Sequence, residues 1–364
     1  MKFLLTALGR TGAGPMYAFE MARALSKEND VLCIVSSDAE NINVWRDETV
    51  RNHRFQIAEI GTYTGIVSFI FQQFNIFKFR KIRNIVAAFA PDVIYSPFGH
   101  FWDKYAFNAI KCKYTVKTVH DVSLHEGERG WKHQFINKWG AFRADKCVIL
   151  SETFKSRLAE RSHYSENDII VIPHATFNEY SNNKTLDLET NYGLMFFGRQ
   201  VKYKGLSVML EAMPAIIAKF PNIKLYIVGK GDLSEYADSI DRLKDNIVLY
   251  NRWIKDSEVA DFFKNVDIAV LPYTDASQSG VIPLANSFGK PSIASDLGGL
   301  PAQILADVTG YVIPPKRPDV LAEKIISLYS NQAVLVEMKK NSWNYASKNT
   351  WDVSAKILMD ALFG

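Results

Sequence analysis

The sequence predicts an α/β protein made of two domains of similar construction. Short apolar runs alternate with amphipathic helical stretches along the chain, a pattern typical of parallel sheets covered by helices on both faces. A length of 364 residues exceeds the usual size of one hydrophobic core. The alternation also stops once, in a polar stretch after residue 177, and then starts again. We therefore expect two Rossmann-like domains whose parallel sheets face a central cleft.

The first domain is expected to span residues 1–177. A helix over Pro15–Ser26 follows the first strand, and Pro15 suits its first turn because an N–H there would be unpaired. The first apolar run is too short for a secretory signal and is interpreted as a strand. The predicted strands are Lys2–Leu8, Val31–Ser36, Arg54–Ile60, Val93–Ser96, Tyr114–Val119, Cys147–Leu150 and Ile169–Ile172.

Residues 178–191 are rich in Asn, Ser, Thr and acidic residues and predict a linker. The second domain is expected to span residues 192–349, and the last segment, about 350–364, predicts a helix that packs back on the first domain. The strands predicted after the linker are Leu194–Phe197, Lys224–Val228, Ile247–Leu249, Ile268–Leu271, Ser292–Ala294 and Gly310–Ile313.

The composition excludes several classes of protein. With 48% hydrophobic residues, 23% charged residues and a net charge of +4, the chain is unlike a disordered or collagen-like protein. Its 43 basic and 39 acidic residues nearly balance, so nucleic acid is not an expected partner. No run approaches the ~20 apolar residues of a membrane span, and the three cysteines are interpreted as buried free thiols. These features favour a cytoplasmic protein.

A Gly-rich turn, Gly9-Arg10-Thr11-Gly12-Ala13-Gly14, follows the first strand. Its backbone could approach a ligand closely and direct helix N–H groups at negative charge. Three interpretations stay open: a tight structural turn, a contact with phosphate or acceptor, and a nicotinamide-cofactor site. The last is disfavoured because the glycine spacing is not G-x-G-x-x-G, although Asp38 stands where a ribose-binding acid is expected.

His120 and Asp121 follow a predicted strand, at the carboxyl edge where open α/β sheets bind ligands. The imidazole could hydrogen-bond a ligand hydroxyl, and Asp121 could orient it or cap the next segment. We interpret the other histidines outside the motifs as structural: His53, His100, His125, His133 and His163.

Two cations open the second domain. Arg199 comes directly after a predicted strand and Gly198, and Lys204 lies near the start of the next helix. Two cations and a helix N-terminus that converge on one point can neutralise a diphosphate leaving group without a metal. The alternative is a pair of solvated loop charges. A later strand-to-helix turn, Gly229-Lys230-Gly231, suits close backbone approach to a base or a phosphate.

A small polar loop follows the predicted strand that ends near Pro272 and leads into a helix that begins near Gly280. The first backbone amides of that helix suit sugar hydroxyls or phosphate oxygens. The candidate ligand-binding residues of this loop are Asp275, Gln278, Ser279, Gly280 and Val281.

Together these motifs resemble those of the retaining GT-B glycosyltransferases of family 4, also called glycosyl transferases group 1. The resemblance covers nearly the whole chain, and its motifs are specific only in combination. Besides the Gly-rich turn and His120-Asp121, it rests on Ser151-Glu152-Thr153-Phe154, Ile172-Pro173-His174, Phe197-Gly198-Arg199 with Lys204-Gly205, Gly229-Lys230-Gly231, and Gly289-Lys290-Pro291 with Gly298-Gly299-Leu300-Pro301.

The resemblance implies metal-independent transfer of a sugar from a nucleoside diphosphate to a hydroxyl acceptor, with retention at the anomeric carbon and no cofactor. It implies that Arg199 and Lys204 bind the diphosphate, that His120 binds the donor sugar, and that residues 9–14 line the acceptor side or the phosphate. No protein base is implied, because the leaving phosphate oxygen takes that role. Expected acceptors are glycans or lipid-linked glycans, in bacterial-type polysaccharide or glycolipid assembly.

One feature departs from the family pattern. Such enzymes usually carry two glutamates eight positions apart, and those positions here hold Ala276 and Leu284. Leucine cannot accept hydrogen bonds from a ribose, and alanine removes a carboxylate from the donor site. We expect Gln278 and Ser279 to substitute in part, with Asp275 a weaker candidate.

The segment from Ile60 to Pro91 contains no acidic residue. Such a segment, in which aromatic and basic residues stand together, could lie on an anionic bilayer at the inner face of the cytoplasmic membrane. A core-packed helix with a solvated basic face explains its second half equally well. The residues concerned are Phe69, Phe71, Phe74, Phe77 and Phe79 beside Lys78, Arg80, Lys81 and Arg83.

Three rival interpretations remain. Another GT-B enzyme, such as a nucleotide-sugar epimerase or an inverting transferase, would share the architecture but use different catalytic carboxylates. A non-catalytic ligand-binding relative would explain the missing glutamates. A dehydrogenase would leave Arg199 and Lys204 without a role.

Overall fold

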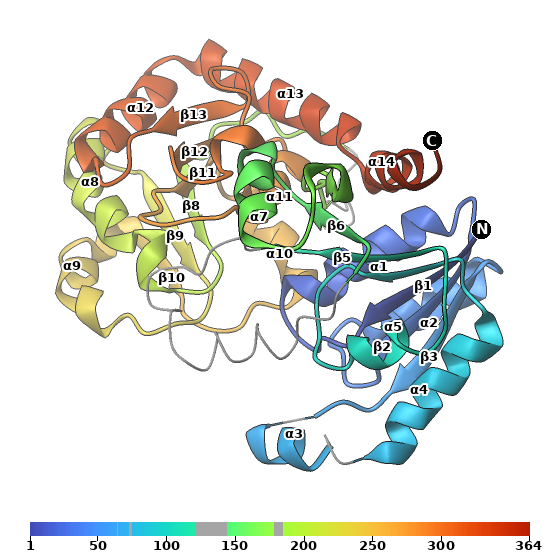
Figure 1. Cartoon of the computed structure of the whole chain (residues 1–364). Helices are drawn as coiled ribbons and strands as arrows, with labels where there is room; N and C mark the ends of the chain where they lie inside the picture. The colour runs from blue at the N-terminus through green and yellow to red at the C-terminus, as the bar shows by residue number, and fades with distance from the viewer. Residues whose placement is uncertain (64, 73–74, 121–143, 178–184) are drawn as a thin grey trace. The chain divides into compact units, whose positions relative to one another are not determined.

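Two separate parallel β-sheets, each covered by helices, form the framework of the protein (Figure 1). The computed structural model describes residues 1–364 except 64, 73–74, 121–143 and 178–184. The chain divides into two compact units. Of the described residues, those up to 120, 144–172 and 351–364 form the first unit, and 173–177 with 185–350 form the second.

The sheet of the first unit has seven strands in the order β3-β2-β1-β4-β5-β6-β7. They are β1 (Lys2–Ala7), β2 (Asp30–Ser36), β3 (Phe55–Ile60), β4 (Val93–Ser96), β5 (Tyr114–Thr118), β6 (Lys146–Ile149) and β7 (Ile169–Val171). The described helices of this unit are α1 (Ala13–Leu25), α2 (Ile42–Arg51), α3 (Ile66–Gln72), α4 (Ile76–Phe89), α5 (Asp103–Phe107), η1 (Glu152–Phe154), α7 (Lys155–Arg161), η2 (Glu166–Asp168) and α14 (Trp351–Phe363).

The sheet of the second unit has six strands in the order β10-β9-β8-β11-β12-β13. They are β8 (Gly193–Phe197), β9 (Lys224–Val228), β10 (Ile247–Tyr250), β11 (Ile268–Leu271), β12 (Ser292–Ser295) and β13 (Gly310–Ile313). Its described helices are η4 (Lys202–Lys204), α8 (Leu206–Lys219), η5 (Ser234–Tyr236), α9 (Ala237–Arg242), η6 (Lys244–Asn246), η7 (Asp256–Glu258), α10 (Val259–Lys264), α11 (Val281–Ser287), η8 (Pro301–Gln303), α12 (Pro318–Ser330) and α13 (Gln332–Lys348).

Every strand that the sequence predicts is present, and the observed ends differ from the predicted ends by at most one residue. The agreement has a simple cause: most strands are short apolar runs, and central ones such as β1, β4 and β11 are buried on both faces, so their composition marks them. In β1, for example, Phe3, Leu4 and Leu5 are all fully buried. The helix predicted over Pro15–Ser26 begins earlier, at Ala13. Pro15 is therefore its third residue, which a missing N–H equally allows.

The end of the chain belongs to the first unit. The Trp351 ring of α14 meets the Tyr17 ring of α1 edge-on, with 4.8 Å between the ring centroids. Residues 173–177 group with the second unit, although the sequence placed them in the first domain. The reason is that the Thr176 hydroxyl donates to the carbonyl oxygens of Ala346 and Asn349, at 2.9 and 3.0 Å.

In each sheet the first strand of the unit lies beside the fourth, and the chain order reverses between them. The reversal lies between the neighbouring strands β1 and β4 in the first unit, and between β8 and β11 in the second. Ligands of open α/β sheets bind beyond the carboxyl ends of the two strands at such a point. The loops after these four strands are therefore the places to look for a site.

Two further predictions from composition can be compared with the structure. No helix in the described part of the chain is both long and apolar enough to cross a bilayer. Cys33, Cys112 and Cys147 are free thiols, the first and last buried and the second partly so.

Candidate functional site

The Gly-rich turn after β1 leads directly into α1. Gly12 precedes the helix with a φ of +82°, a conformation that favours glycine. Thr11, Gly12 and Ala13 are exposed, and no described side chain caps the first N–H groups of α1. These N–H groups suit an anionic or hydroxylated ligand. The Arg10 guanidinium serves the protein itself, because its Nη1 donates to the carbonyl oxygen of Tyr63 at 2.8 Å.

The last glycine of the turn has a packing role. A Cβ at Gly14 would lie only 2.9 Å from ring atoms of Phe98, in the loop after β4. A Cβ at Gly9 would meet only Pro15, at an ordinary 3.8 Å. The Phe98 ring in turn lies 4.4 Å from the His120 ring, measured between centroids. The structure therefore brings the Gly-rich turn and His120 into one neighbourhood, whereas Asp121 lies outside the described residues.

His120 is oriented by a backbone contact. Its Nε2 lies 2.8 Å from the carbonyl oxygen of Pro97, and a carbonyl can only accept, so Nε2 carries the proton. In the neutral ring Nδ1 is then the acceptor atom. The Tyr17 ring of α1 packs edge-on against the imidazole, with centroids 4.8 Å apart. The ring is thus held between α1 and the loop after β4, close to the β1–β4 reversal where a ligand is expected.

A buried carboxylate, that of Asp103, begins α5, the helix that follows β4. The Asp103 Oδ2 accepts from the Ser96 hydroxyl and from the His100 N–H, both at 2.7 Å. Burial nevertheless raises the pKa of Asp103 to about 7. Burial lowers the pKa of His100 to about 4, and its Nδ1 accepts from the Trp102 N–H at 3.2 Å. The structural role predicted for His100 agrees with these contacts, and sequence reasoning missed Asp103.

Lys204 and Arg199 share the loop after β8. Lys204 is 8% exposed, and its Nζ donates to the carbonyl oxygen of Phe197 at 3.0 Å. Gly198 has a φ of +100°, and a Cβ there would lie 2.5 Å from that nitrogen. Burial first, and then the guanidinium of Arg199, lower the pKa of Lys204 to about 7. Arg199 is exposed, so the loop presents one permanent cation with a poorly solvated amine behind it.

The glycines after β9 allow two loops to touch. A Cβ at Gly229 would lie 2.1 Å from the carbonyl oxygen of Gly198, and a Cβ at Gly231 would lie 2.1 Å from that of Gln200. Asn251 also holds Gly231, by a contact of 3.0 Å to each of its backbone N–H and C=O groups. The sequence suggested that these glycines approach a ligand, but close packing of the β8 and β9 loops already requires them. Lys230, between them, is exposed.

The loop after β11 is tied to Lys204 through a tyrosine. The Tyr273 ring is buried, with its centroid 5.6 Å from the Lys204 Nζ. Its hydroxyl lies 3.2 Å from the Ser279 Oγ, which also accepts from the Val281 N–H at 3.2 Å. Gln303 holds both backbone groups of Ser279, each at 2.9 Å. As predicted, α11 begins after Gly280.

Sequence reasoning missed two residues that contact Ser279: Tyr273 in this loop and Gln303 in η8. The position of Tyr273, two residues after the carboxyl end of β11, was a usable signal. Gln303 gave none, because 24 residues separate it from Ser279.

Ala276 and Leu284 stand where the resembling enzymes usually carry glutamates, and neither position offers a replacement for the missing carboxylate. Leu284 is 6% exposed in α11, with its side chain in the interior. Ala276 packs at a close backbone contact, because a Cβ at Gly298 would lie 2.1 Å from its carbonyl oxygen. Asp275 and Gln278 are both half-buried. No group of three His, Cys, Asp or Glu residues in the described ranges could hold a metal ion.

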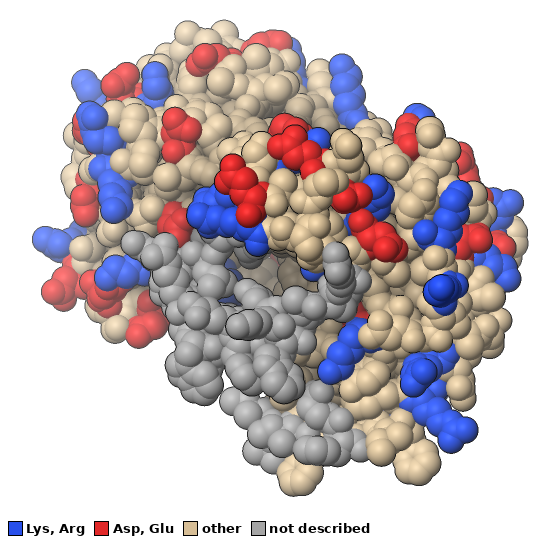
Figure 2. Space-filling view, in the orientation of Figure 1, with Lys and Arg blue, Asp and Glu red and all other residues tan. Residues whose placement is uncertain are grey.

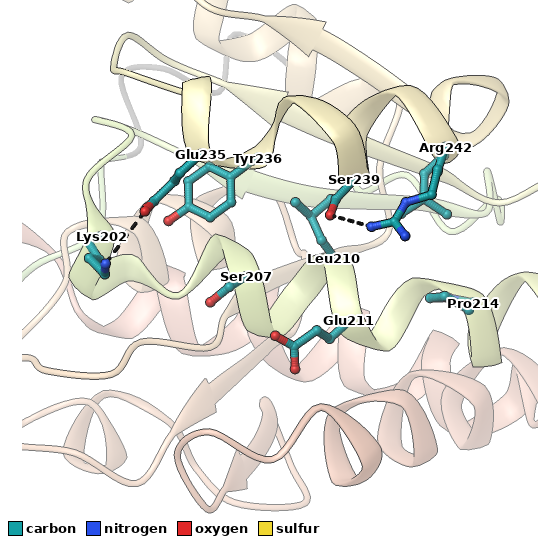
Figure 3. A pocket seen from close by; sticks show the side chains of 10 residues that line it. Lys202, Ser207, Leu210, Glu211, Pro214, Glu235, Tyr236, Ser239 and Arg242 are labelled. Carbon is teal, nitrogen blue, oxygen red and sulfur yellow. Dashed lines mark hydrogen bonds and ion pairs between the residues drawn. The ribbon is translucent and has the colours of Figure 1, made fainter.

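A separate groove of about 580 Å³ lies between α8 and the η5–α9 segment (Figure 3). Lys202 and Glu235 form an ion pair at one end, 3.5 Å apart, and Arg242 donates to Ser239 at the other end. None of the predicted site residues lines it. Its lining consists of Lys202, Ser207, Leu210, Glu211, Pro214, Glu235, Tyr236, Ser239, Arg242 and Leu243.

Comparison with known families identifies two matching segments. The family described as Glycosyltransferase Family 4 matches residues 15–176, and the family described as Glycosyl transferases group 1 matches residues 191–331. Between them these matches cover most of the chain.

Curated relatives and solved structures agree with this result. A glycosyltransferase of Methanocaldococcus jannaschii, itself uncharacterized, is 24% identical over 88% of this chain and 86% of its own. Phosphatidyl-myo-inositol mannosyltransferase of Mycobacterium tuberculosis is 27% identical over 53% of each chain. The crystal structure of Anabaena HepE in complex with UDP and glucose has a TM-score of 0.75 at 15% identity, over 100% of this chain and 99% of that one. The protein belongs to the family 4 (group 1) glycosyltransferases and has their GT-B fold.

Proposed function

We propose that the protein is a retaining glycosyltransferase that moves a sugar from a nucleoside-diphosphate sugar to a hydroxyl acceptor. The observation that carries this proposal is the pair of cations after β8, where Arg199 is exposed and Lys204 is buried behind Gly198. Charges held in place, one of them poorly solvated, stabilise a leaving diphosphate more strongly than mobile surface charges do. The UDP named in the HepE complex supports a nucleoside diphosphate as the donor class.

The proposed chemistry needs no metal and no protein nucleophile. The acceptor oxygen forms the new bond to the anomeric carbon while the bond from that carbon to the phosphate oxygen breaks. The departing phosphate oxygen takes the acceptor proton on the same face of the sugar, which retains the configuration. Arg199 and Lys204 compensate the charge that develops on the diphosphate.

His120 is proposed to contact the donor sugar. Its Nε2–H is committed to Pro97, so the neutral ring would receive a sugar hydroxyl at Nδ1. The exposed backbone of residues 11–13 is proposed to line the acceptor side or the phosphate. The ribose contact is proposed for Gln278, since the Ser279 hydroxyl already accepts from the Val281 N–H and lies against Tyr273.

The proposed acceptors are glycans or lipid-linked glycans, in polysaccharide or glycolipid assembly at the cytoplasmic face of a membrane. The name of the M. tuberculosis relative, which includes a phosphatidylinositol acceptor and a mannosyl group, supports a lipid-linked acceptor.

Donor binding is tested by thermal shift with a panel of nucleoside diphosphates. A ligand at about 100 times its Kd adds about 2.7 kcal/mol to the free energy of unfolding. We expect one nucleoside diphosphate to raise the Tm, and Arg199→Ala and Lys204→Ala to abolish that rise. Lys202→Ala is the matched control, because Lys202 lies in the same turn but is 85% exposed and paired with Glu235. A full response in both Arg199→Ala and Lys204→Ala would refute the assigned site.

The anomeric configuration of the product separates retention from the inverting alternative. With the donor identified by thermal shift, NMR of the first product formed should show the configuration of the donor. An inverted product would contradict the mechanism, and an epimerised donor without transfer would establish the epimerase alternative.

A further inference from the structure

The first unit carries a surface on which exposed apolar and basic side chains stand together. Phe71 lies in the last turn of α3, and Ile76 and Phe77 begin α4. Their side chains are 73%, 74% and 85% exposed. Three large apolar side chains this exposed within seven residues of sequence exceed the scatter of single apolar residues that is normal on a protein surface. We call this region the α3–α4 surface and define it by Phe71, Ile76, Phe77, Arg80, Lys81 and Arg83.

The apolar side chains of α4 divide into two groups with different roles. Phe79, Ile82 and Val86 are buried in the core of the first unit. Ile76 and Phe77 point away from that core, as their exposure indicates. The inward face of α4 is therefore occupied, and the helix cannot lie in a bilayer with that face down. Only its exposed first turn and the end of α3 are available for an apolar contact.

Lys78 holds the two helices together. Its Nζ donates to the Gln72 side chain at 2.6 Å and to the carbonyl oxygen of Gly61. The same nitrogen lies 5.1 Å from the centroid of the Trp102 ring. Lys78 is thus part of the structure of this surface, and it ties the start of α4 to the end of α3.

The remaining cations form the basic part of the surface. Arg80, Lys81 and Arg83 are exposed on the turns of α4 that follow Phe77. No carboxylate among the described residues forms a salt bridge with any of them, and the sequence has no acidic residue from 60 to 91. Figure 2 shows blue side chains with no red ones among them in the lower right part of this face, where Figure 1 places α4.

We propose that the α3–α4 surface docks the protein on an anionic lipid bilayer, with Phe71, Ile76 and Phe77 entering the interface and Arg80, Lys81 and Arg83 contacting anionic headgroups. Three apolar side chains are too few for the core of a stable protein interface, which buries about 800 Å² on each partner. They suit an interface in which a small apolar insertion and electrostatic attraction act together, since either signal alone binds weakly. The uniform sign of charge favours an anionic partner.

The test is flotation of the full chain with two kinds of vesicle at low salt. One contains phosphatidylcholine with phosphatidylglycerol as the anionic lipid, and the other contains phosphatidylcholine alone. We expect strong binding to the anionic vesicles, weak binding to the neutral ones, and loss of binding in high salt. Arg80→Gln, Lys81→Gln and Arg83→Gln should each weaken partitioning about fivefold, the equivalent of about 1 kcal/mol for each cation.

The apolar contribution is tested by Ile76→Ser with Phe77→Ser, which should reduce binding to anionic vesicles at least tenfold. The matched control is Val50→Ser with Arg51→Gln on α2, because Val50 is 87% exposed and Arg51 is also exposed in the same unit. This control should bind as the original protein does. The proposal is overturned if the original protein leaves anionic vesicles unbound at low salt, or if the Ile76 and Phe77 variant binds as well as the control.

The nucleoside-diphosphate thermal shift is measured on the same variants. It should stay unchanged in all of them, because none of the substituted residues belongs to the proposed donor site. An unchanged shift shows that a variant is folded, so loss of flotation then reports on the surface alone. Failure of vesicle binding would leave the proposed donor site intact, and failure of the thermal shift would leave the membrane surface intact.

Discussion

The side-chain nitrogen of Lys204 donates to the carbonyl oxygen of Phe197 at 3.0 Å, so the last residue of β8 positions the amine directly behind Gly198. This contact makes position 198 sensitive to the addition of a side chain. A Cβ there would lie 2.5 Å from the nitrogen, and its φ of +100° is unfavourable for any other residue.

We predict that Gly198→Ala weakens nucleoside-diphosphate binding at least tenfold and lowers the free energy of unfolding by about 1–3 kcal/mol. The displaced amine and the strained backbone are the two causes. Calorimetric titration measures the first effect and denaturant unfolding the second. Gly65→Ala is the control, because a Cβ at position 65 would meet no atom within 4 Å. Equal affinity in Gly198→Ala and Gly65→Ala would contradict the role assigned to Lys204.

The lowered pKa of Lys204 predicts proton uptake on donor binding. Its pKa is about 7 in the free protein against an ordinary 10.5. A bound diphosphate favours the charged amine and raises this pKa, so above pH 7 the protein must take up a proton to bind. Affinity should therefore fall up to about tenfold per pH unit between about pH 7.5 and about pH 9. Titrations in buffers of different ionisation enthalpy measure the uptake. Lys204→Met should bind weakly with a flat profile, and a flat profile in the original protein would disprove the linkage.

Asp103 predicts a pH dependence of stability with the opposite sign from that of ordinary carboxylates. Its pKa is raised to about 7 in the folded state, from 3.8 in the unfolded chain. The folded state therefore binds the extra proton, and this contribution is complete at low pH and is lost as pH rises from about 4 to about 7. The loss is on the order of 4 kcal/mol.

Asp103→Asn isolates this effect from that of its neighbour. His100 acts in the other direction, because its lowered pKa of about 4 makes stability rise between about pH 4 and its ordinary value of 6.5. The asparagine keeps an oxygen for Ser96 and the His100 N–H. The difference in unfolding free energy between the variant and the original protein should grow in favour of the variant from pH 4 to pH 7. A constant difference would mean that Asp103 titrates normally.

Lys339 and Asp267 form a fully buried ion pair, 2.7 Å apart and both 0% exposed. Asp267 also accepts from the Tyr329 hydroxyl at 3.2 Å. We predict that Lys339→Met lowers the free energy of unfolding by about 3–5 kcal/mol, since it leaves a buried carboxylate without its cation. Lys340→Met is the matched control in the same helix, because Lys340 is 48% exposed and should cost less than about 1 kcal/mol. Comparable losses in urea unfolding would show that Asp267 finds another partner.

The fold could be read from the sequence because its signals are local. The central strands, such as β1, β4 and β11, are short apolar runs buried on both faces, so composition marks them, whereas the edge strands β3 and β10 are partly exposed. The positions of Gly12 before α1 and of Arg199 and Lys204 after β8 could also be predicted. The reason is that strand, turn and helix follow one another directly along the chain. The loops that carry the candidate site residues of each unit could be predicted for the same reason.

The sequence by itself determined the α/β class, the strands, and the loops that carry Arg199, Lys204 and His120. Only the tertiary structure decided which atoms meet. Tyr273 links Lys204 to Ser279, and Gln303 hydrogen-bonds Ser279 from 24 residues away. Gly229 and Gly231 allow two loops to pack closely. The physical reason is that the apolar composition of a segment by itself predicts that the segment is buried. Hydrogen bonds, close backbone approach and desolvation depend on strand order, which places side by side residues that no local pattern connects.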